Sequence, residues 1–174
     1  MPSLRRLVSA PPQPPPRSAP EADDHMIRRP DILLVEDSKD DRDLFELAVL
    51  KSGLDVTLHV AIDASDAIAR LKRMIASPDR RIPAVIVLDL ALPGGPKGGT
   101  LLDLIRNTLA SEPVAVVVWT GSHLASDRTQ CESSGVDDFV IKPKTFAGLV
   151  EFVQSLPRFF STAKTGAANR RVMP

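Results

Sequence analysis

The sequence has few of the features of secreted, membrane-bound or nucleic-acid-binding proteins. Cys131 is the single cysteine among 174 residues, so no internal disulfide can form and a cytoplasmic location is expected. Residues 1–30 contain no long apolar run, so we expect neither a signal peptide nor a membrane anchor there. Residues 31–157 hold 13 basic and 19 acidic residues, a net charge of −6, with no basic stripe. This argues against nucleic-acid binding by the folded part.

The two ends of the chain differ in composition from its centre. Eight of the 16 prolines fall within residues 1–30, which we expect to be disordered or polyproline-like. Residues 157–174 form a basic tail that we expect to be partly disordered, and they are too few for a further domain. Residues 31–156 are therefore expected to form one stand-alone domain.

Apolar runs alternate with amphipathic segments along this domain. Strands are expected over five runs: 31–36, 56–60, 85–90, 114–120 and 137–142. Helices are expected over five segments: 39–52, 63–75, 100–109, 123–134 and 145–156. Nearly all-apolar strands alternating with helices indicate an α/β fold with a parallel sheet covered on both faces. Right-handed crossovers favour a doubly wound sheet of five strands.

The helices at the two ends of this pattern carry apolar stripes. Ser38 and Asp41 form a capping pair before the helix at 39–52, and Gly53 ends it. Apolar residues of this helix recur at mostly helical spacing: Leu44, Leu47, Ala48 and Leu50. The inward stripe expected for the last helix comprises Phe146, Leu149, Val150, Val153 and Leu156.

Three phenylalanines near the C-terminus lie off that inward stripe. They are Phe152, Phe159 and Phe160, and together they would form a second apolar patch. Exposed patches of this kind often mark an interface. We therefore expect a protein-interaction surface here, and a homodimer.

Asp89 interrupts the apolar stretch "AVIVLDLALPGG" at 84–95. An ionised carboxylate is costly in a strand buried on both faces unless another group compensates it. Ligands of doubly wound sheets bind beyond the carboxyl ends of the strands, so residues that follow the other strands are the candidate partners. These residues are Glu36, Asp37, Thr120 and Lys142.

Glu36, Asp37 and Asp89 would bring up to three negative charges into one pocket. At roughly 4 Å and an effective dielectric near 20, each like-charged pair costs on the order of 4 kcal/mol, more than Lys142 alone can offset. No histidine or cysteine lies at these strand ends, so an all-oxygen site suits Mg²⁺ better than zinc. The hydroxyl of Thr120 and the charge of Lys142 suit phosphate oxygens.

Each of these residues also has a structural interpretation. Asp37 could serve merely as a helix cap, Lys142 could be a surface lysine at a strand end, and Thr120 could be a β-branched residue that favours a strand. Asp89 is harder to explain this way, because an acid in an apolar strand needs a partner. The combination favours a functional site.

Four motifs resemble those of the response-regulator receiver domain, the CheY-like superfamily, over about residues 31–156. They are "VEDS" at 35–38, "VLDLALPGG" at 87–95, "VVWTGS" at 117–122 and "VIKP" at 140–143. The resemblance implies a flavodoxin-like sheet of order 2-1-3-4-5 with five helices. It also implies that Asp89 accepts a phosphoryl group from a sensor histidine kinase. Mg²⁺ would be held by Glu36, Asp37, Asp89 and the backbone carbonyl of Ala91.

The resemblance further implies a conformational switch. Thr120 and Lys142 would bind phosphoryl oxygens, and the ring of Phe139 would turn inward as Thr120 moves. Phe139 could also be a plain core residue. The output implied is protein binding, so the chain is not expected to be an enzyme.

The end of the last helix, "FVQSLPRFF", is similar to single-domain regulators that partner bacteriophytochrome histidine kinases. Two alternatives stay open: a phosphorelay intermediate serving a histidine phosphotransfer protein, and a phosphorylation-independent dimerising scaffold. A Mg²⁺-dependent phosphatase of Rossmann-like fold is disfavoured. Such enzymes carry a second aspartate two residues after the first, where this chain has Ala91.

Overall fold

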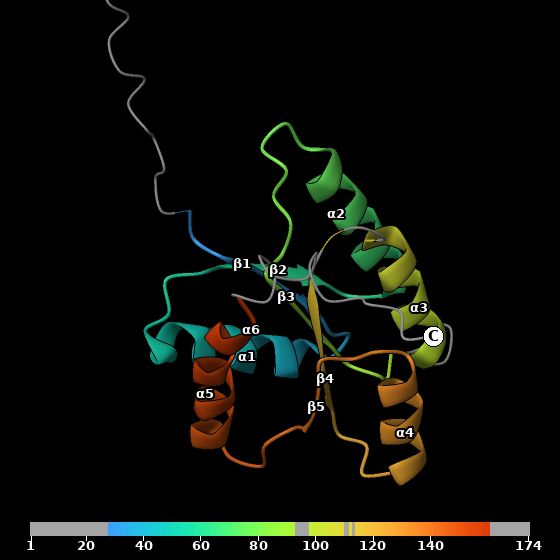
Figure 1. Ribbon diagram of the computed structural model, residues 1–174. Helices are drawn as coiled ribbons and strands as arrows, with labels where there is room; N and C mark the ends of the chain where they lie inside the picture. Colours follow the sequence, from blue (N-terminus) through green and yellow to red (C-terminus); the bar gives the residue numbers. More distant parts are fainter. Residues whose placement is uncertain (1–27, 93–97, 110–111, 113, 161–174) are drawn as a thin grey trace, which may run out of the picture.

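Five strands alternate with helices along the chain (Figure 1). The computed structural model describes residues 28–92, 98–109, 112 and 114–160. The strands are β1 (Asp31–Val35), β2 (Thr57–Ala61), β3 (Val85–Leu88), β4 (Ala115–Thr120) and β5 (Asp138–Ile141). The helices are α1 (Lys39–Ser52), α2 (Ala64–Ala76), α3 (Gly98–Leu109), α4 (Ala125–Ser133), α5 (Phe146–Ser155) and α6 (Pro157–Phe160). The five strands and the first five helices follow the predicted order, with ends that differ from the predictions by a few residues, and α6 is a short additional helix that was not predicted.

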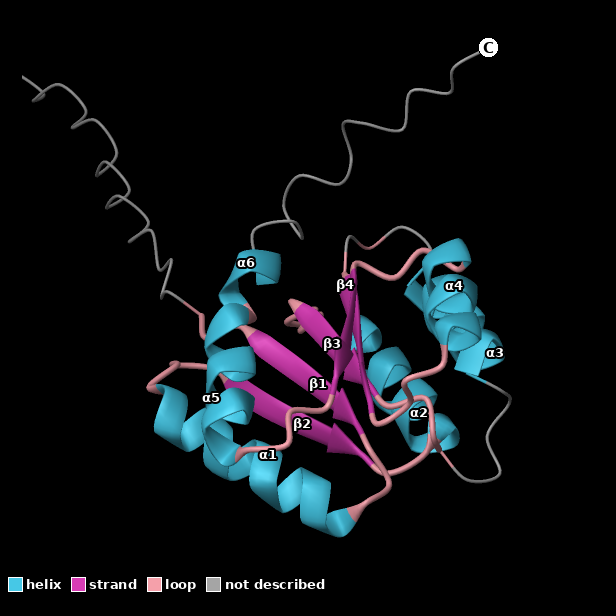
Figure 2. Cartoon of the chain, turned by 90° about the horizontal axis from the view of Figure 1, so that it is seen from below, coloured by secondary structure: helices cyan, strands magenta, loops and turns pink. Residues whose placement is uncertain are grey.

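All five strands are parallel and lie in the order β2-β1-β3-β4-β5, which confirms the predicted topology. Figure 2 shows α1 and α5 on one face of the sheet and α2, α3 and α4 on the other. Because every strand runs the same way, the residues that follow the strands collect at one edge of the sheet.

The core consists of two layers that share the sheet. Ile32 and Leu34 of β1 pack toward α1 and α5, whereas Leu33 and Val35 pack toward α2 and α3. This alternation is the ordinary consequence of a strand whose successive side chains point to opposite faces. Buried apolar side chains on both faces explain why the strands read as continuous apolar runs.

The capping predictions for α1 are confirmed for Ser38 and Gly53, but the backbone N–H of Ser38 donates to Glu36 and not to Asp41, so the capping pair is formed only in part. Ser38 Oγ accepts a hydrogen bond from the backbone N–H of Asp41 at 3.3 Å, and Gly53 ends the helix with a φ of 74°. The apolar stripe of α1 also differs from the expected one. Among the four apolar residues at helical spacing, only Ala48 is buried, and Phe45 joins it in the core. The other three residues of the expected stripe, Leu44, Leu47 and Leu50, are exposed.

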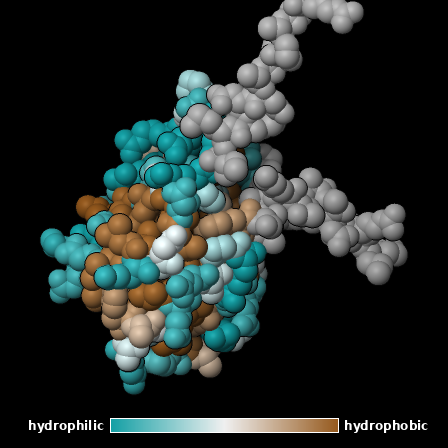
Figure 3. Space-filling model, turned by 90° about the vertical axis from the view of Figure 1, so that its left-hand side faces the viewer, coloured by the Kyte–Doolittle hydropathy of each residue, from teal (hydrophilic) through white to brown (hydrophobic). Residues whose placement is uncertain are grey.

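The buried and exposed residues differ from the prediction because α1 turns the face that carries Phe45 and Ala48 toward the sheet. Phe45 fills the space between the helix and the sheet, which leaves the leucines on the outward side. Figure 3 shows apolar residues on the side of the molecule that carries α1 and α5. The apolar spacing in the sequence therefore did not identify the buried face of this helix.

The C-terminal phenylalanines also differ from the prediction. Phe152 and Phe159 are only 7% and 9% exposed and belong to the core, and Phe160 is partly buried against it. The expected exposed patch is therefore wrong for Phe152 and Phe159. Their rings fill the layer between the sheet and α5, where Phe152 packs against Trp119. The homodimer and its interface stay predictions.

The inward stripe of α5 is partly as expected. Leu149, Val153 and Leu156 are buried, and Val150 packs partly buried against the same layer. Phe146 is exposed, because it is the first residue of the helix. Phe152, which was not part of the expected stripe, is buried in the core instead.

The predicted terminal segments fall largely outside the described residues. Within residues 157–174, Pro157–Phe160 form α6 and the rest lie outside the described part, as do residues 1–27. Among the described residues, no helix has the length and apolar character needed to cross a membrane.

Candidate functional site

The end of β1 positions the first two acids of the site. The backbone N–H of Glu36 donates to the carbonyl of Ala61 at 3.0 Å, so Glu36 still pairs with β2 although the strand ends at Val35. Its Oε1 accepts from the backbone N–H of Ser38 at 3.0 Å. The Glu36 side chain is fully buried, whereas Asp37 is exposed.

Asp89 is positioned in the same way at the end of β3. Its backbone N–H donates to the carbonyl of Val35 at 3.0 Å, which continues the pairing of β3 with β1. Its Oδ1 accepts from the backbone N–H of Ala91 at 3.1 Å, and the residue is only 4% exposed. The acid in the apolar run is therefore buried, as its neighbours in the sequence suggested.

Lys142 is the compensating group. Its backbone N–H donates to the carbonyl of Thr120 at 2.8 Å, which fixes it at the end of β5. Its ammonium then donates to Asp89 Oδ2 at 2.9 Å and to Glu36 Oε2 at 2.7 Å. A third hydrogen bond runs to Asp41 Oδ2 at 2.7 Å.

Asp41 is the site residue that the sequence reasoning missed, because it was interpreted only as part of a capping pair. It lies in the first turn of α1, and its side chain is 35% exposed. The signal that could have found it is its position. A helix that follows β1 begins at the same edge of the sheet where Lys142 ends β5.

Burial and charge oppose each other at this site. Burial by itself would lower the pKa of Lys142, but hydrogen bonds to Asp41, Glu36 and Asp89 outweigh it and hold that pKa above its usual range. Burial raises the pKa of the Glu36 carboxyl. The hydrogen bond from Lys142 lowers this pKa in part, and the negative charge of Asp89 raises it further. One ammonium is shared among three carboxylates, so negative charge remains in excess.

Three carboxylates of this edge could hold a cation together. Glu36, Asp37 and Asp89 each offer an oxygen, and these oxygens lie within 4.8 Å of one another. The set consists of hard oxygen donors, which suit Mg²⁺, and a divalent cation would neutralise the excess negative charge. The part assigned to the Ala91 carbonyl stays a prediction.

Thr120 and Phe139 are both buried near this site. Thr120 is the last residue of β4, and its Oγ1 accepts from the backbone N–H of Ser122 at 3.2 Å. Phe139 is 6% exposed and packs with Val118 and Cys131. An inward ring is compatible with a core residue and with a switch residue, so the switch stays a prediction.

Comparison with known proteins agrees with this geometry. Residues 32–154 match the response regulator receiver domain family. Response regulator Rcp1 of Synechocystis is 31% identical over 129 residues, which are 74% of this chain and 87% of that protein.

Two solved structures are similar in both sequence and fold. The phosphorylated cyanobacterial phytochrome response regulator RcpA has a TM-score of 0.66 and 25% identity, with 77% of this chain and 95% of that chain covered. The Mn²⁺-bound form of Rcp1 has a TM-score of 0.63 and 29% identity, with 83% and 99% covered. A buried aspartate at the sheet edge accepts a hydrogen bond from Lys142, and residues 32–154 match the family. The chain therefore belongs to the response regulator receiver domain family.

Proposed function

We propose that the protein accepts a phosphoryl group on Asp89 from a histidine kinase, with Mg²⁺, and that phosphorylation switches a protein-binding surface. One observation carries the proposal. The Lys142 ammonium donates to Asp89 Oδ2 at the edge where Glu36, Asp37 and Asp89 converge within 4.8 Å. A buried carboxylate next to a fixed cation and a metal-suited set of oxygens fits phosphoryl transfer.

The chemistry of the transfer follows from these groups. An oxygen of Asp89 forms a bond to phosphorus while the phosphorus–nitrogen bond of the donor phosphohistidine breaks. The imidazole leaves with the electron pair of that bond and takes up a proton. Lys142 stands beside the reacting carboxylate to stabilise charge on the phosphoryl oxygens. Glu36, Asp37 and Asp89 would hold Mg²⁺, which would neutralise charge on the transferred group.

The relatives suggest the class of partner. RcpA is described as a cyanobacterial phytochrome response regulator, and the chain also resembles AtBRR, a bacteriophytochrome response regulator, at 29% identity and a TM-score of 0.58. A phytochrome-type histidine kinase is therefore the partner we propose. Thr120 and Phe139 are proposed to carry the signal from Asp89 to the binding surface. The cytoplasmic location, the homodimer and the absence of enzymatic output belong to the same proposal.

The test is phosphorylation by a small donor. Incubation with acetyl phosphate and Mg²⁺ is expected to add one phosphoryl mass to the protein, measured by intact-mass spectrometry. Asp89→Asn is expected to abolish that mass, because the amide offers no nucleophilic carboxylate. Chelation of the metal by EDTA is expected to suppress it in the unmodified protein.

Asp103→Asn is the matched control. Asp103 is an exposed aspartate within α3, and it does not follow a strand. Its variant should be labelled like the unmodified protein. An unmodified protein that stays unlabelled with acetyl phosphate, phosphoramidate and a phosphorylated histidine kinase would contradict the proposal.

A further inference from the structure

Trp119 is buried beside the site for a reason that packing alone does not supply. It precedes Thr120 in β4 and is 3% exposed. Its indole Nε1–H is buried and has no hydrogen-bond partner among the described residues. A phenylalanine or a leucine would fill an apolar layer without burying an unsatisfied donor. Some other property of the indole must therefore favour tryptophan here.

That property is the face of the ring. Lys142 Nζ lies 4.6 Å from the ring centroid of Trp119, within the range of a cation–π interaction. Tryptophan is the aromatic side chain that attracts a cation most strongly, and the attraction grows as the cation is withdrawn from water. The Lys142 side chain is only 18% exposed. The ammonium thus contacts carboxylates through its hydrogen bonds and the indole through its charge.

The indole is itself held rigidly from both helices on this face of the sheet. It stacks on Phe152 of α5, with ring centroids 6.2 Å apart and an interplanar angle of 7°. It also meets Phe45 of α1 edge to face at 5.3 Å. Because these rings lie in the packed core, the face that Trp119 offers to Lys142 has a fixed position.

We propose that Trp119 is a positioning residue for Lys142 and holds its ammonium where it reaches Asp89. The proposal rests on the proposed phosphorylation of Asp89 for its functional consequence. A lysine has a flexible four-carbon stem, and three carboxylates in different directions pull on its charge. The indole face, with its centroid 4.6 Å from Lys142 Nζ, adds a further contact that restricts the ammonium. A phosphoryl group arriving at Asp89 then meets a cation that is already in place.

The first measurement needs no phosphorylation. Methylene protons next to an ammonium that lies over an indole face resonate upfield of those of an exposed lysine. We expect this upfield shift for the ε-methylene protons of Lys142 in the NMR spectrum of the unmodified protein. The shift should persist in part in Trp119→Phe, which keeps an aromatic face, and disappear in Trp119→Leu.

The second measurement is the rate of phosphorylation by acetyl phosphate at saturating Mg²⁺. Trp119→Leu is expected to slow it about 3- to 30-fold, the range of one cation–π interaction that is partly withdrawn from water. Trp119→Phe should lose about 3-fold or less, because its ring restores part of the interaction. Trp119→Met takes the place of the leucine variant if that variant does not fold. A merely structural role would not make the rate follow aromaticity in this way.

The outcomes separate this proposal from the proposed function. Lys142 signals at the position of an exposed lysine in the unmodified protein would overturn the role of Trp119, as would equal rates for all variants. A protein that accepts no phosphoryl group contradicts the proposed function instead. In that case the NMR shift alone decides whether Trp119 positions Lys142.

Discussion

The two edges of this parallel sheet handle buried charge in different ways. At the amino edge, Asp31 is 7% exposed and accepts hydrogen bonds from Arg81 at 3.0 and 3.3 Å, while His59 Nε2 lies 2.7 Å from its Oδ1. At the carboxyl edge, Lys142 is the one cationic side chain among the described residues that pairs with Glu36, Asp41 and Asp89. The amino edge gives one buried carboxylate two basic side chains as partners, whereas at the carboxyl edge three carboxylates share one cationic side chain.

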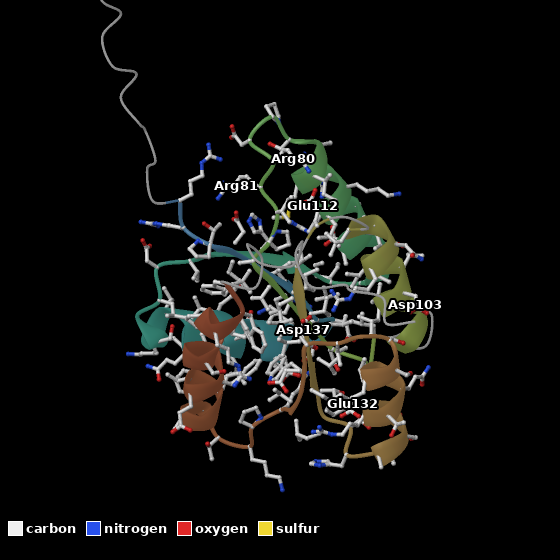
Figure 4. The ribbon with its side chains drawn as sticks, in the orientation of Figure 1. Arg80, Arg81, Asp103, Glu112, Glu132 and Asp137 are labelled. Carbon is white, nitrogen blue, oxygen red and sulfur yellow. The ribbon has the colours of Figure 1, made fainter. Side chains whose placement is uncertain are left out.

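Other pairs at the amino edge match one cation to one carboxylate. Arg29 lies 2.7 Å from Asp55, and Arg80 donates to Glu112. Arg80, Arg81 and Glu112 lie toward the upper end of the molecule in Figure 4. Matched charges of this kind need no further ligand. An excess of one sign is unfavourable unless a bound cation offsets it, and this excess lies at the edge where we propose the functional site.

Neutralising an acid at the carboxyl edge should have the largest effect, and the effect should be on metal binding. Asp37 is exposed and belongs to the proposed metal-binding set, so Asp37→Asn removes the charge of one ligand with little change in packing. We expect its Mg²⁺ affinity to fall about 10- to 100-fold, because one charge a few ångströms from a divalent ion is lost. Isothermal titration calorimetry measures this. An affinity within twofold of the unmodified protein would contradict the site.

Neutralising an acid at the amino edge should affect stability instead. In Asp31→Asn, Arg81 and His59 lose a buried carboxylate partner. We expect the free energy of unfolding to fall by about 2 kcal/mol, a typical cost for breaking hydrogen bonds to a buried charged group. Urea denaturation monitored by circular dichroism measures the loss. The Mg²⁺ affinity of this variant should be unchanged, and a parallel loss of Mg²⁺ binding would erase the distinction between the two edges.

The smallest expected effect is a gain in stability at the carboxyl edge. Burial raises the pKa of Glu36 above its unfolded value of 4.5, so the folded protein binds this proton more tightly than the unfolded chain does. The contribution of Glu36 to stability is therefore most favourable below pH 4.5 and is lost as the pH rises through the folded pKa. In EDTA at pH 7, Glu36→Gln should be more stable than the unmodified protein by about 1 kcal/mol.

Denaturation in EDTA at pH 7 and at pH 4 measures this difference. The advantage of Glu36→Gln should shrink at the lower pH, where the native carboxyl is also neutral. An equal advantage at both values would indicate a packing effect instead of a charge effect. Saturating Mg²⁺ should reverse the order at pH 7, because in our proposal the charged carboxylate of the native glutamate binds the metal more tightly than a neutral amide would.

The sequence was sufficient to predict the site where backbone topology decides positions. Glu36, Asp89 and Lys142 follow three different parallel strands, so the fold had to bring them to one edge. The apolar run around Asp89 already indicated that this acid is buried and needs a partner. Neither inference depended on side-chain orientation.

The sequence was insufficient to predict which of several large apolar side chains on one helix are buried. Leu44, Leu47 and Leu50 repeat at nearly helical spacing, yet α1 buries Phe45 and Ala48. Phe152 and Phe159 lie off the inward stripe of the last helix as judged from spacing, yet both belong to the core. Competition among large side chains for one layer is a property of the assembled structure, because each ring excludes the others.

By itself the sequence determined the order of strands and helices, the family, and the edge at which the acids and the lysine meet. Hydrophobic periodicity and chain connectivity carry this information locally. Only the tertiary structure decided that Asp41 shares Lys142 and that the face of Trp119 contacts the same ammonium. These contacts join residues 101 and 23 positions apart in the chain, and no local pattern specifies the direction in which such distant side chains point.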